Sequence, residues 1–235
     1  MTRKITQMMV RIGLAIWAAV LVFPAQTPAV SVHASAIDIG DLMAKALNNV
    51  HSFMMVTDSI TKPAPTSPGG VMKMHVEEIF IHRGSGYVLS MQMMIDGKFS
   101  SEVYTGTHVC LKHTAAEAWN CTYPPSYAKL SLASMDPVKV FKASGIVTTS
   151  RGAAGTKSIK GQSCTGYRFA MSMSSIHLTG YGTIWFSSDN GRVVQLDETS
   201  TVALVAGSPP MVTTGTSSYS RWDDASLRIP AVPVS

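Results

Sequence analysis

The chain has 235 residues, and only 14% of them are charged. Its formal net charge of +5 depends on three basic residues near the N-terminus, because the stretch after residue 36 holds 16 basic and 14 acidic side chains. No cluster of lysine and arginine interleaved with aromatic residues remains there, so the sequence excludes nucleic acid as an expected partner.

The first 36 residues have the pattern of a secretory signal peptide. Basic residues precede an apolar run of eleven residues, Gly13–Phe23, which is shorter than the ~20 residues that span a bilayer. An Ala-Ser-Ala sequence at 34–36 then offers a cleavage site. Residues 1–36 are therefore predicted to be a signal peptide and 37–235 a single secreted or cell-envelope domain, with an uncleaved N-terminal anchor as the alternative.

Three cysteines occur, Cys110, Cys121 and Cys164. An oxidising compartment favours one disulfide, and Cys110 and Cys121 flank a short polar loop that a hairpin would close. The alternative is three buried thiols that act as small apolar side chains. No spacing matches a zinc site, so no metal is expected.

An amphipathic helix is predicted at the start of the domain. Asp38 is a favourable N-cap, and apolar residues follow it at helical spacing. This stripe requires a larger apolar surface to pack on. Its members are Ile39, Leu42, Met43, Ala46, Leu47 and Val50.

Most of the remaining chain is predicted to form strands, because apolar and polar side chains alternate along it. Asp96-Gly97 favours a hairpin turn between two of these strands. No strand–helix–strand alternation occurs, so the sheet is predicted to be antiparallel. The predicted strands cover 53–60, 71–82, 87–95, 98–104, 108–113, 146–151, 157–160, 163–173, 182–187, 192–205 and 211–222.

The middle of the chain interrupts this pattern. Two consecutive prolines, Pro124 and Pro125, begin an irregular stretch, in which 127–134 and 138–143 are predicted to be short helices. The fold class is therefore predicted to be mainly β (α+β), with about eleven antiparallel strands and two or three short helices.

Three segments together resemble a known family. They are the helix end Ala46–Val50 that runs into a strand, the tryptophan strand Gly182–Phe186 with the hairpin after it, and the last strand Tyr219–Asp224, which closes at Ile229-Pro230. In these the chain resembles the LolA-like superfamily of envelope lipoprotein and lipid carriers, including the mycobacterial branch of glycolipid-carrying lipoproteins. It departs from that branch in having no cysteine for a lipid anchor before Cys110.

The resemblance implies an antiparallel half-barrel with helices on its concave side. It also implies an exported, non-enzymatic carrier or binding protein for apolar ligands, namely lipid or the acyl chains of lipoproteins. The alternative is a protein-interaction or envelope-sensor module, because one scaffold serves both. The expected partners are a lipid or acylated protein and, transiently, a membrane surface. A monomer without a cofactor is expected.

Met-x-Met occurs three times, and residues i and i+2 of a strand share a face. These pairs fit a pliable wall for lipid chains, plain core filling, or a thioether site for Cu(I) that includes His75. The candidate ligand-binding residues are Leu42, Met43, Leu47, Met72, Met74, Phe80, Leu89, Met91, Met93, Tyr167, Phe169, Met171 and Met173.

Two short motifs match parts of the penicillin-binding protein set. Ser126–Lys129 has the form S-x-x-K and Ser188–Asn190 the form S-D-N, but no K-T-G follows. Asp and Asn before a glycine are better explained by a hairpin turn. No catalytic residue is therefore predicted.

Overall fold

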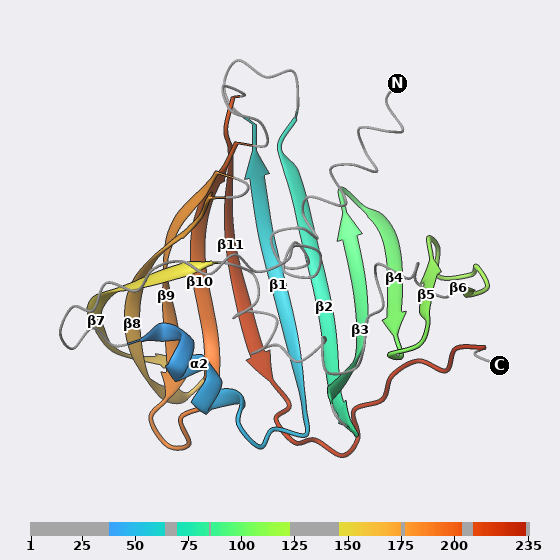
Figure 1. Cartoon of the computed structure of the whole chain (residues 1–235), viewed down its shortest axis with the longest axis horizontal. Coiled ribbons are helices and arrows are strands. Elements are labelled where there is room, and N and C mark those ends of the chain that lie inside the picture. The colour runs from blue at the N-terminus through green and yellow to red at the C-terminus, as the bar shows by residue number, and fades with distance from the viewer. Residues whose placement is uncertain are drawn as a thin grey trace.

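The computed structural model describes residues 38–63, 70–84, 86–122, 146–174, 177–203 and 209–233. These residues form one open sheet of eleven strands and a single helix, α2 (Figure 1). The predicted signal peptide and the two helices predicted after Pro125 lie outside the described residues.

All the strand pairs of the sheet are antiparallel. The order across it is β6-β5-β4-β3-β2-β1-β11-β10-β9-β8-β7, so two meanders meet where β1 pairs with β11. The strands are β1 (Ser52–Lys62), β2 (Met72–Arg83), β3 (Gly86–Ile95), β4 (Lys98–Tyr104), β5 (Val109–Lys112), β6 (Asn120–Thr122), β7 (Val147–Ile159), β8 (Gln162–Met173), β9 (Leu178–Ser187), β10 (Val193–Val202) and β11 (Met211–Ser220).

The predicted antiparallel sheet of about eleven strands is confirmed, but two of its members differ. The short strand β6 was not predicted, and the strands predicted at 146–151 and 157–160 are one long strand, β7. Register shifts in β7 fall around Gly152 and Gly155, whose φ angles are +89° and +95°. Glycine adopts these angles without a steric penalty, so β7 bends there and continues.

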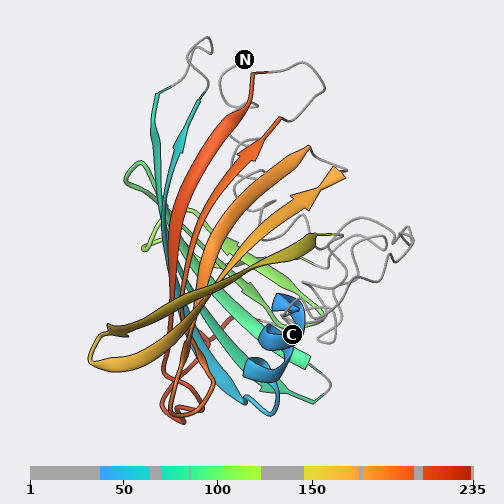
Figure 2. The ribbon, with the colours of Figure 1, turned by 90° about the vertical axis from the view of Figure 1, so that its left-hand side faces the viewer.

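Helix α2 (Ile39–Leu47) begins where the sequence predicts. The Asp38 carboxylate accepts hydrogen bonds from the N–H groups of Gly40 (2.7 Å) and Asp41 (3.3 Å), which satisfies free donors of the first turn. Ile39 and Leu47 are buried against the sheet. Figure 2 shows the sheet curving around the side on which α2 lies.

The core lies between α2 and this side of the sheet, and Phe53 on β1 is at its centre. Phe53 is 1% exposed. Its ring stacks on Phe80 and Trp222, with centroids 4.5 Å and 5.1 Å away, and meets the edge of Tyr87 at 6.3 Å. These aromatic contacts join both meanders, because Phe80 and Tyr87 belong to one and Trp222 follows the last strand of the other.

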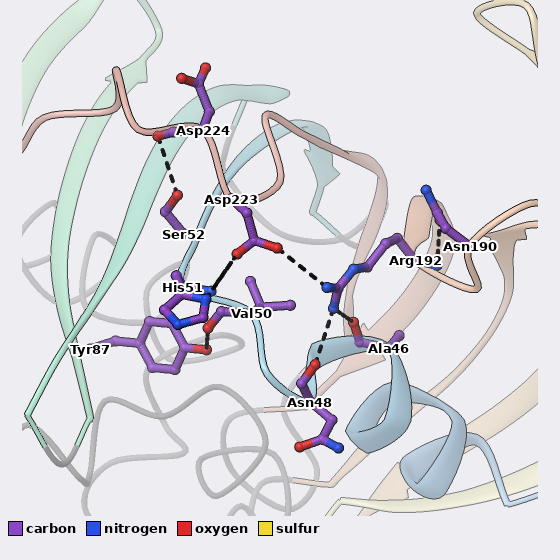
Figure 3. Close-up of polar contacts among 10 residues, drawn as sticks. All are labelled: Ala46, Asn48, Val50, His51, Ser52, Tyr87, Asn190, Arg192, Asp223 and Asp224. Carbon is purple, nitrogen blue, oxygen red and sulfur yellow. Dashed lines mark hydrogen bonds and ion pairs between the residues drawn. The ribbon is translucent and has the colours of Figure 1, made fainter.

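Arg192 holds the C-terminal end of α2 in place (Figure 3). Its Nη1 donates to the carbonyl oxygens of Ala46 (2.8 Å) and Asn48 (3.2 Å), and its Nη2 to Asp223 Oδ2 (3.3 Å). Asp223 also accepts a hydrogen bond from the backbone N–H of His51 at 2.5 Å. One guanidinium therefore ties the end of α2 to the segment after β11, and Asp223 ties that segment to the residue before β1.

On the opposite side of the sheet a polar cluster fastens the edge strand β7. Trp185 Nε1 donates to Asp197 Oδ2 at 3.2 Å. The Lys157 ammonium on β7 lies 4.0 Å from the centroid of the Trp185 ring and 3.7 Å from Asp197. A cation over an indole face is a favourable contact, so β7 is held through its side chains as well as its ladder with β8.

The disulfide predicted between Cys110 and Cys121 is confirmed. The two residues face each other across the β5–β6 ladder, with Cα atoms 4.0 Å apart. Cys164 is a free, buried thiol on β8. The helix of the described chain is too short to cross a membrane.

Candidate functional site

The candidate site is the face of the sheet that carries Phe53 and α2, called here the concave face. Directly paired residues of an antiparallel ladder share a face, so the strand registers extend this face across the whole sheet. Phe53 pairs with Phe80, and Phe80 pairs with Leu89. By alternation along each strand, Met72 and Met74 on β2 and Met91 and Met93 on β3 lie on the same face.

The pairing of β8 with β9, in the other half of the sheet, places Met171 and Met173 on this face. Met171 pairs with Gly180, and Met173 with Leu178. Leu178 and Met173 are buried in the same cluster as Phe53 and α2. The three methionine pairs therefore point to one side of the sheet, which is the geometry that the proposed ligand surface requires.

The structure divides the predicted site residues between two apolar clusters. Met74, Met91 and Met93 pack with Val76 and Tyr104 on β2–β4. Met72 belongs to neither cluster. The rest belong to, or pack against, the cluster beneath α2: Leu42, Met43, Leu47, Phe80, Leu89, Tyr167, Phe169, Met171 and Met173.

A strip of small and polar residues separates Met72 and Met74 on β2 from Phe169 and Met171 on β8. It runs over β9, β10, β11 and β1, and adjacent strands are about 4.8 Å apart, so the two sides are about 24 Å apart along the sheet. We call this the polar strip, and its members are Thr57, Ser59, Thr61, Gly180, Gly182, Glu198, Ser200, Thr213, Gly215 and Ser217.

Glu198 is the acidic member of the polar strip. It pairs with Gly182 on β9 and with Gly215 on β11, so neither flanking strand places a side chain beside it. A Cβ atom at Gly182 would lie 2.4 Å from the carbonyl oxygen of Asp197 and 2.7 Å from Cζ of Phe169. Glycine is thus required at 182, and the Phe169 ring lies across it toward Glu198.

Two hydroxyl groups of the polar strip lack a partner. The Oγ atoms of Ser59 and Ser200 are buried and make no hydrogen bond to the part of the chain that the structure describes. Their residues are 8% and 1% exposed. By contrast, the nearby hydroxyls of Thr57 and Ser217 satisfy each other at 2.8 Å. A buried polar group without a partner is costly, so Ser59 and Ser200 each mark a place where a further polar atom would be stabilising.

Two further carboxylates lie on the concave face, on either side of Met91. Glu78 on β2 pairs with Met91, and Met91 pairs with Glu102 on β4. Desolvation raises the pKa of Glu78 to about 7, and it raises the pKa of Glu198 to about 7 as well. Neither carboxylate makes a hydrogen bond or ion pair with the described residues.

Glu102 differs because it has a donor. The Tyr104 hydroxyl donates to Glu102 Oε2. Burial raises the pKa of Glu102, and this hydrogen bond and the charge of His113 oppose the rise. The pKa of Tyr219 is also raised, mainly by burial and to a smaller extent by the charges of Glu78 and Glu198. Both carboxylates therefore act on the same part of the concave face.

Basic side chains are almost absent from the paired strand residues of this face. Lys98, at the turn end of β4 opposite Ile95, is the one lysine or arginine that the described ladders place there. The remainder lie on the opposite face, by alternation from their partners: Lys62, Lys73, Arg83, Lys112, Lys157 and Arg168. The concave face is therefore apolar with a negative component.

The carboxylates were missed by the sequence analysis, although a signal for them exists. On β2 every second residue from Met72 to Phe80 is apolar except Glu78, which lies between Val76 and Phe80. Glu198 lies in the same way between Leu196 and Ser200. A charged residue in phase with the apolar face of a strand is the pattern that would have predicted them.

The other candidates contribute no site in the described residues. Ser188–Asn190 forms the turn between β9 and β10, as predicted, and Ser126–Lys129 lies outside the described residues. His75 is on the opposite face, where it contacts Asp58 at 2.7 Å and Glu77 at 3.4 Å. It is thus separated by the sheet from the thioethers of Met72 and Met74. No group of three potential metal ligands occurs within the described ranges.

Comparison with known proteins gives matches in structure alone. No family model and no curated protein sequence matches the chain. A DUF1329 family protein from Desulfovibrio piger matches with a TM-score of 0.33 and 10% identity, over 80% of this chain and 93% of its own. A LolA superfamily protein from Nitrosomonas europaea matches with a TM-score of 0.29 and 11% identity, over 82% of this chain and 96% of its own.

Proposed function

We propose that this chain is an exported, non-enzymatic binding or carrier protein for apolar ligands, which it holds against the concave face beside α2. The observation that supports this most is the arrangement of that face. Large apolar side chains stand on both sides of a strip of small residues, and the strip offers almost no bulk with which to fill its own surface. If this face served only to pack the core, large side chains would be expected in the polar strip as well.

The residue types fit a ligand that varies in shape. Methionine is unbranched and flexible, so it adapts to irregular apolar partners. Met74, Met91 and Met93 on one side, and Met171 and Met173 on the other, bring thioethers to both ends of the polar strip. An acyl chain is the ligand class that such a surface accommodates without directional contacts.

The partners follow from this surface. The ligand is a lipid or the acyl group of an acylated protein, and loading and release involve transient contact with a membrane surface. The chain acts as a monomer outside the cytoplasm. The Cys110–Cys121 disulfide supports that location, because such bonds persist in oxidising compartments.

Uptake of the uncharged dye N-phenyl-1-naphthylamine tests the proposal. Met74 is half-buried on the concave face, whereas Met94, on the adjacent strand, is 48% exposed on the opposite face. Met74→Glu is expected to lower dye affinity at least tenfold, because it places a charge in the apolar surface that desolvates the dye. Met94→Glu is the matched control and should bind like the wild type.

Equal dye binding by both folded variants and the wild type would contradict the proposal. Circular dichroism establishes that each variant is folded. Native mass spectrometry of the protein purified from its own host adds an independent test, in which a bound lipid mass should appear and should be lost on organic extraction. A protein that neither carries lipid nor takes up the dye would favour the interaction or sensor module instead.

A further inference from the structure

The concave face carries negative charge that the described residues do not neutralise. Glu198 has glycine on both flanking strands, so no side chain directly beside it supplies a donor. Glu78, at 8% exposure, also lacks a hydrogen bond to the described residues. Removing an unpaired carboxylate from water, almost fully at Glu78 and in part at the half-buried Glu198, is costly in free energy. A glutamine or a leucine at either position would avoid that cost. The presence of two carboxylates therefore points to a function for their charge.

The unpaired serine hydroxyls are a second and independent observation. Ser59 pairs with Gly215, and Gly215 pairs with Glu198, so Ser59 lies two strands from Glu198 in the same row of the concave face. Ser200 follows Glu198 by two residues on the same face of β10. Both hydroxyls are more than nine-tenths buried and lack a partner in the described chain. By strand and residue spacing Ser59 and Ser200 are about 11 Å apart, which is too far for one group to meet both. Ser59 faces Glu198 across Gly215, so its orphaned hydroxyl and this carboxylate indicate one missing polar group between them.

The missing group must donate hydrogen bonds. A carboxylate accepts hydrogen bonds only, while serine hydroxyls accept as well as donate. An ammonium group has three donors and no acceptor, and its positive charge offsets that of the carboxylate. An acidic headgroup would meet like charge from Glu198 and Glu78, and among the described strand residues of this face only Lys98 could compensate, so it is disfavoured.

We propose that Glu198 and Ser59 form a subsite for the amine of a cationic amphiphile, whose apolar chain contacts the methionine-rich surface on either side. This inference rests on the proposed function and names its ligand class. Gly215, which pairs with both Glu198 and Ser59, places no side chain between them.

Three probes with the same chain test the subsite: dodecylamine, dodecanol and dodecanoate, each below its critical micelle concentration. Isothermal titration calorimetry at pH 8 measures their affinities for the delipidated wild-type protein. Dodecylamine is expected to bind about tenfold or more tightly than dodecanol, the effect of one hydrogen bond to a charged group. Dodecanoate is expected to bind more weakly than both.

Variants then assign the preference to Glu198. Glu198→Gln should reduce the preference for dodecylamine over dodecanol to about twofold, since the charge is lost and the shape is kept. Ser59→Ala should weaken dodecylamine binding severalfold and leave dodecanoate unchanged. The matched control is Glu77→Gln, which removes the same charge from the opposite face, where the Glu77 side chain is 44% exposed. It should preserve the preference.

Each outcome distinguishes this inference from the function on which it rests. Equal binding of the three probes by the wild type would overturn the amine subsite and leave the apolar carrier in place. An amine preference that persists in Glu198→Gln would overturn the role of Glu198. Tighter binding of dodecanol than of dodecylamine would assign the strip to a hydroxylated ligand instead. Failure of the wild type to bind any probe, or the dye, would overturn the proposed function itself.

Discussion

Glu78 shows how much a single carboxylate on the concave face can lower the free energy of unfolding. It lies between Met55 and Met91 in the sheet, and it is 8% exposed. Desolvation raises its pKa from 4.5 to about 7. The folded state therefore binds a proton that the unfolded state releases between these pH values, so the free energy of unfolding falls as pH rises from about 4.5 to about 7.

Replacement of Glu78 by glutamine is expected to remove this pH dependence. Glu78→Gln should raise the free energy of unfolding of the ligand-free protein by up to about 3 kcal/mol at pH 8, because the shift in pKa no longer opposes folding. At pH 4 the carboxyl is protonated in both states, and the variant and the wild type should differ little. Urea unfolding at both pH values measures the effect.

Glu77→Gln is the matched control for this change. Glu77 is the sequence neighbour of Glu78, and its side chain is 44% exposed on the opposite face. The control should lack the stabilisation at pH 8. A Glu78→Gln variant that is equally stabilised at pH 4 and pH 8 would show that lost packing or hydrogen bonding, and not ionisation, is the cause.

The residues of the concave face could be predicted in part. Alternation alone places Met91 and Met93 on one face of their strand. Alternation cannot say which strands are neighbours. The polar strip forms because β10 lies next to β11 and β11 next to β1, and only the strand registers of the structure establish this. Ser59 and Gly215 are 156 positions apart in the sequence, and no local pattern predicts that they pair.

At the scale of elements, the strand β7 shows where local patterns fail. The glycines at 152 and 155 separate two short β-like stretches in the sequence and favour a break. In the structure they are bulges in one strand, because pairing with β8 and the Lys157–Trp185 contact hold both sides of the bend. Helix α2 is the opposite case, since its N-cap and apolar stripe are local and predicted its start correctly.

The attachment of α2 to the sheet depends on Arg192, which gives an element-scale prediction. Arg192→Ala removes hydrogen bonds to two carbonyls at the end of α2 and to Asp223. It is expected to lower the free energy of unfolding by about 2 kcal/mol, the size of hydrogen bonds to a charged group. Amide hydrogen exchange should accelerate in 39–50 more than in β3 or β8.

Two variants test whether the guanidinium itself is responsible. Arg192→Lys keeps the charge but lacks the planar fork that reaches several acceptors, so an intermediate effect is expected. Arg168→Ala removes an exposed arginine whose guanidinium donates to the carbonyl oxygen of Ala153 at 3.1 Å, and should cost about 0.5 kcal/mol or less. Unchanged exchange of α2 in Arg192→Ala would contradict this role.

At the scale of the whole molecule, the described strands form two meanders that share one junction, the ladder between β1 and β11. Nine residue pairs form that ladder, from Met54–Ser220 to Lys62–Val212. The core beneath α2 also draws residues from both meanders, including Phe53 and Leu89 from one and Phe169 and Ile184 from the other. Because the halves share a core, we expect them to unfold as one cooperative unit.

Met55 is the residue at which this cooperativity is best tested. It is 2% exposed, and it pairs with Glu78 of its own meander and with Tyr219 across the junction. Met55→Ala is expected to lower the free energy of unfolding by about 2 to 4 kcal/mol, because it leaves a cavity in the shared core. The exposed Met94, at 48%, provides the control, and Met94→Ala should cost about 0.5 kcal/mol or less.

The measurement is fluorine NMR of 5-fluorotryptophan-labelled protein during urea unfolding. Trp119 lies between β5 and β6 in the first meander, and Trp185 lies in β9 of the second. In the wild type both resonances should lose intensity with one midpoint, and in Met55→Ala both midpoints should fall together. If the Trp119 midpoint fell while that of Trp185 stayed in place, the β1–β11 junction would join two independently stable halves, and the concave face would then be a surface between domains whose relative position a ligand could change.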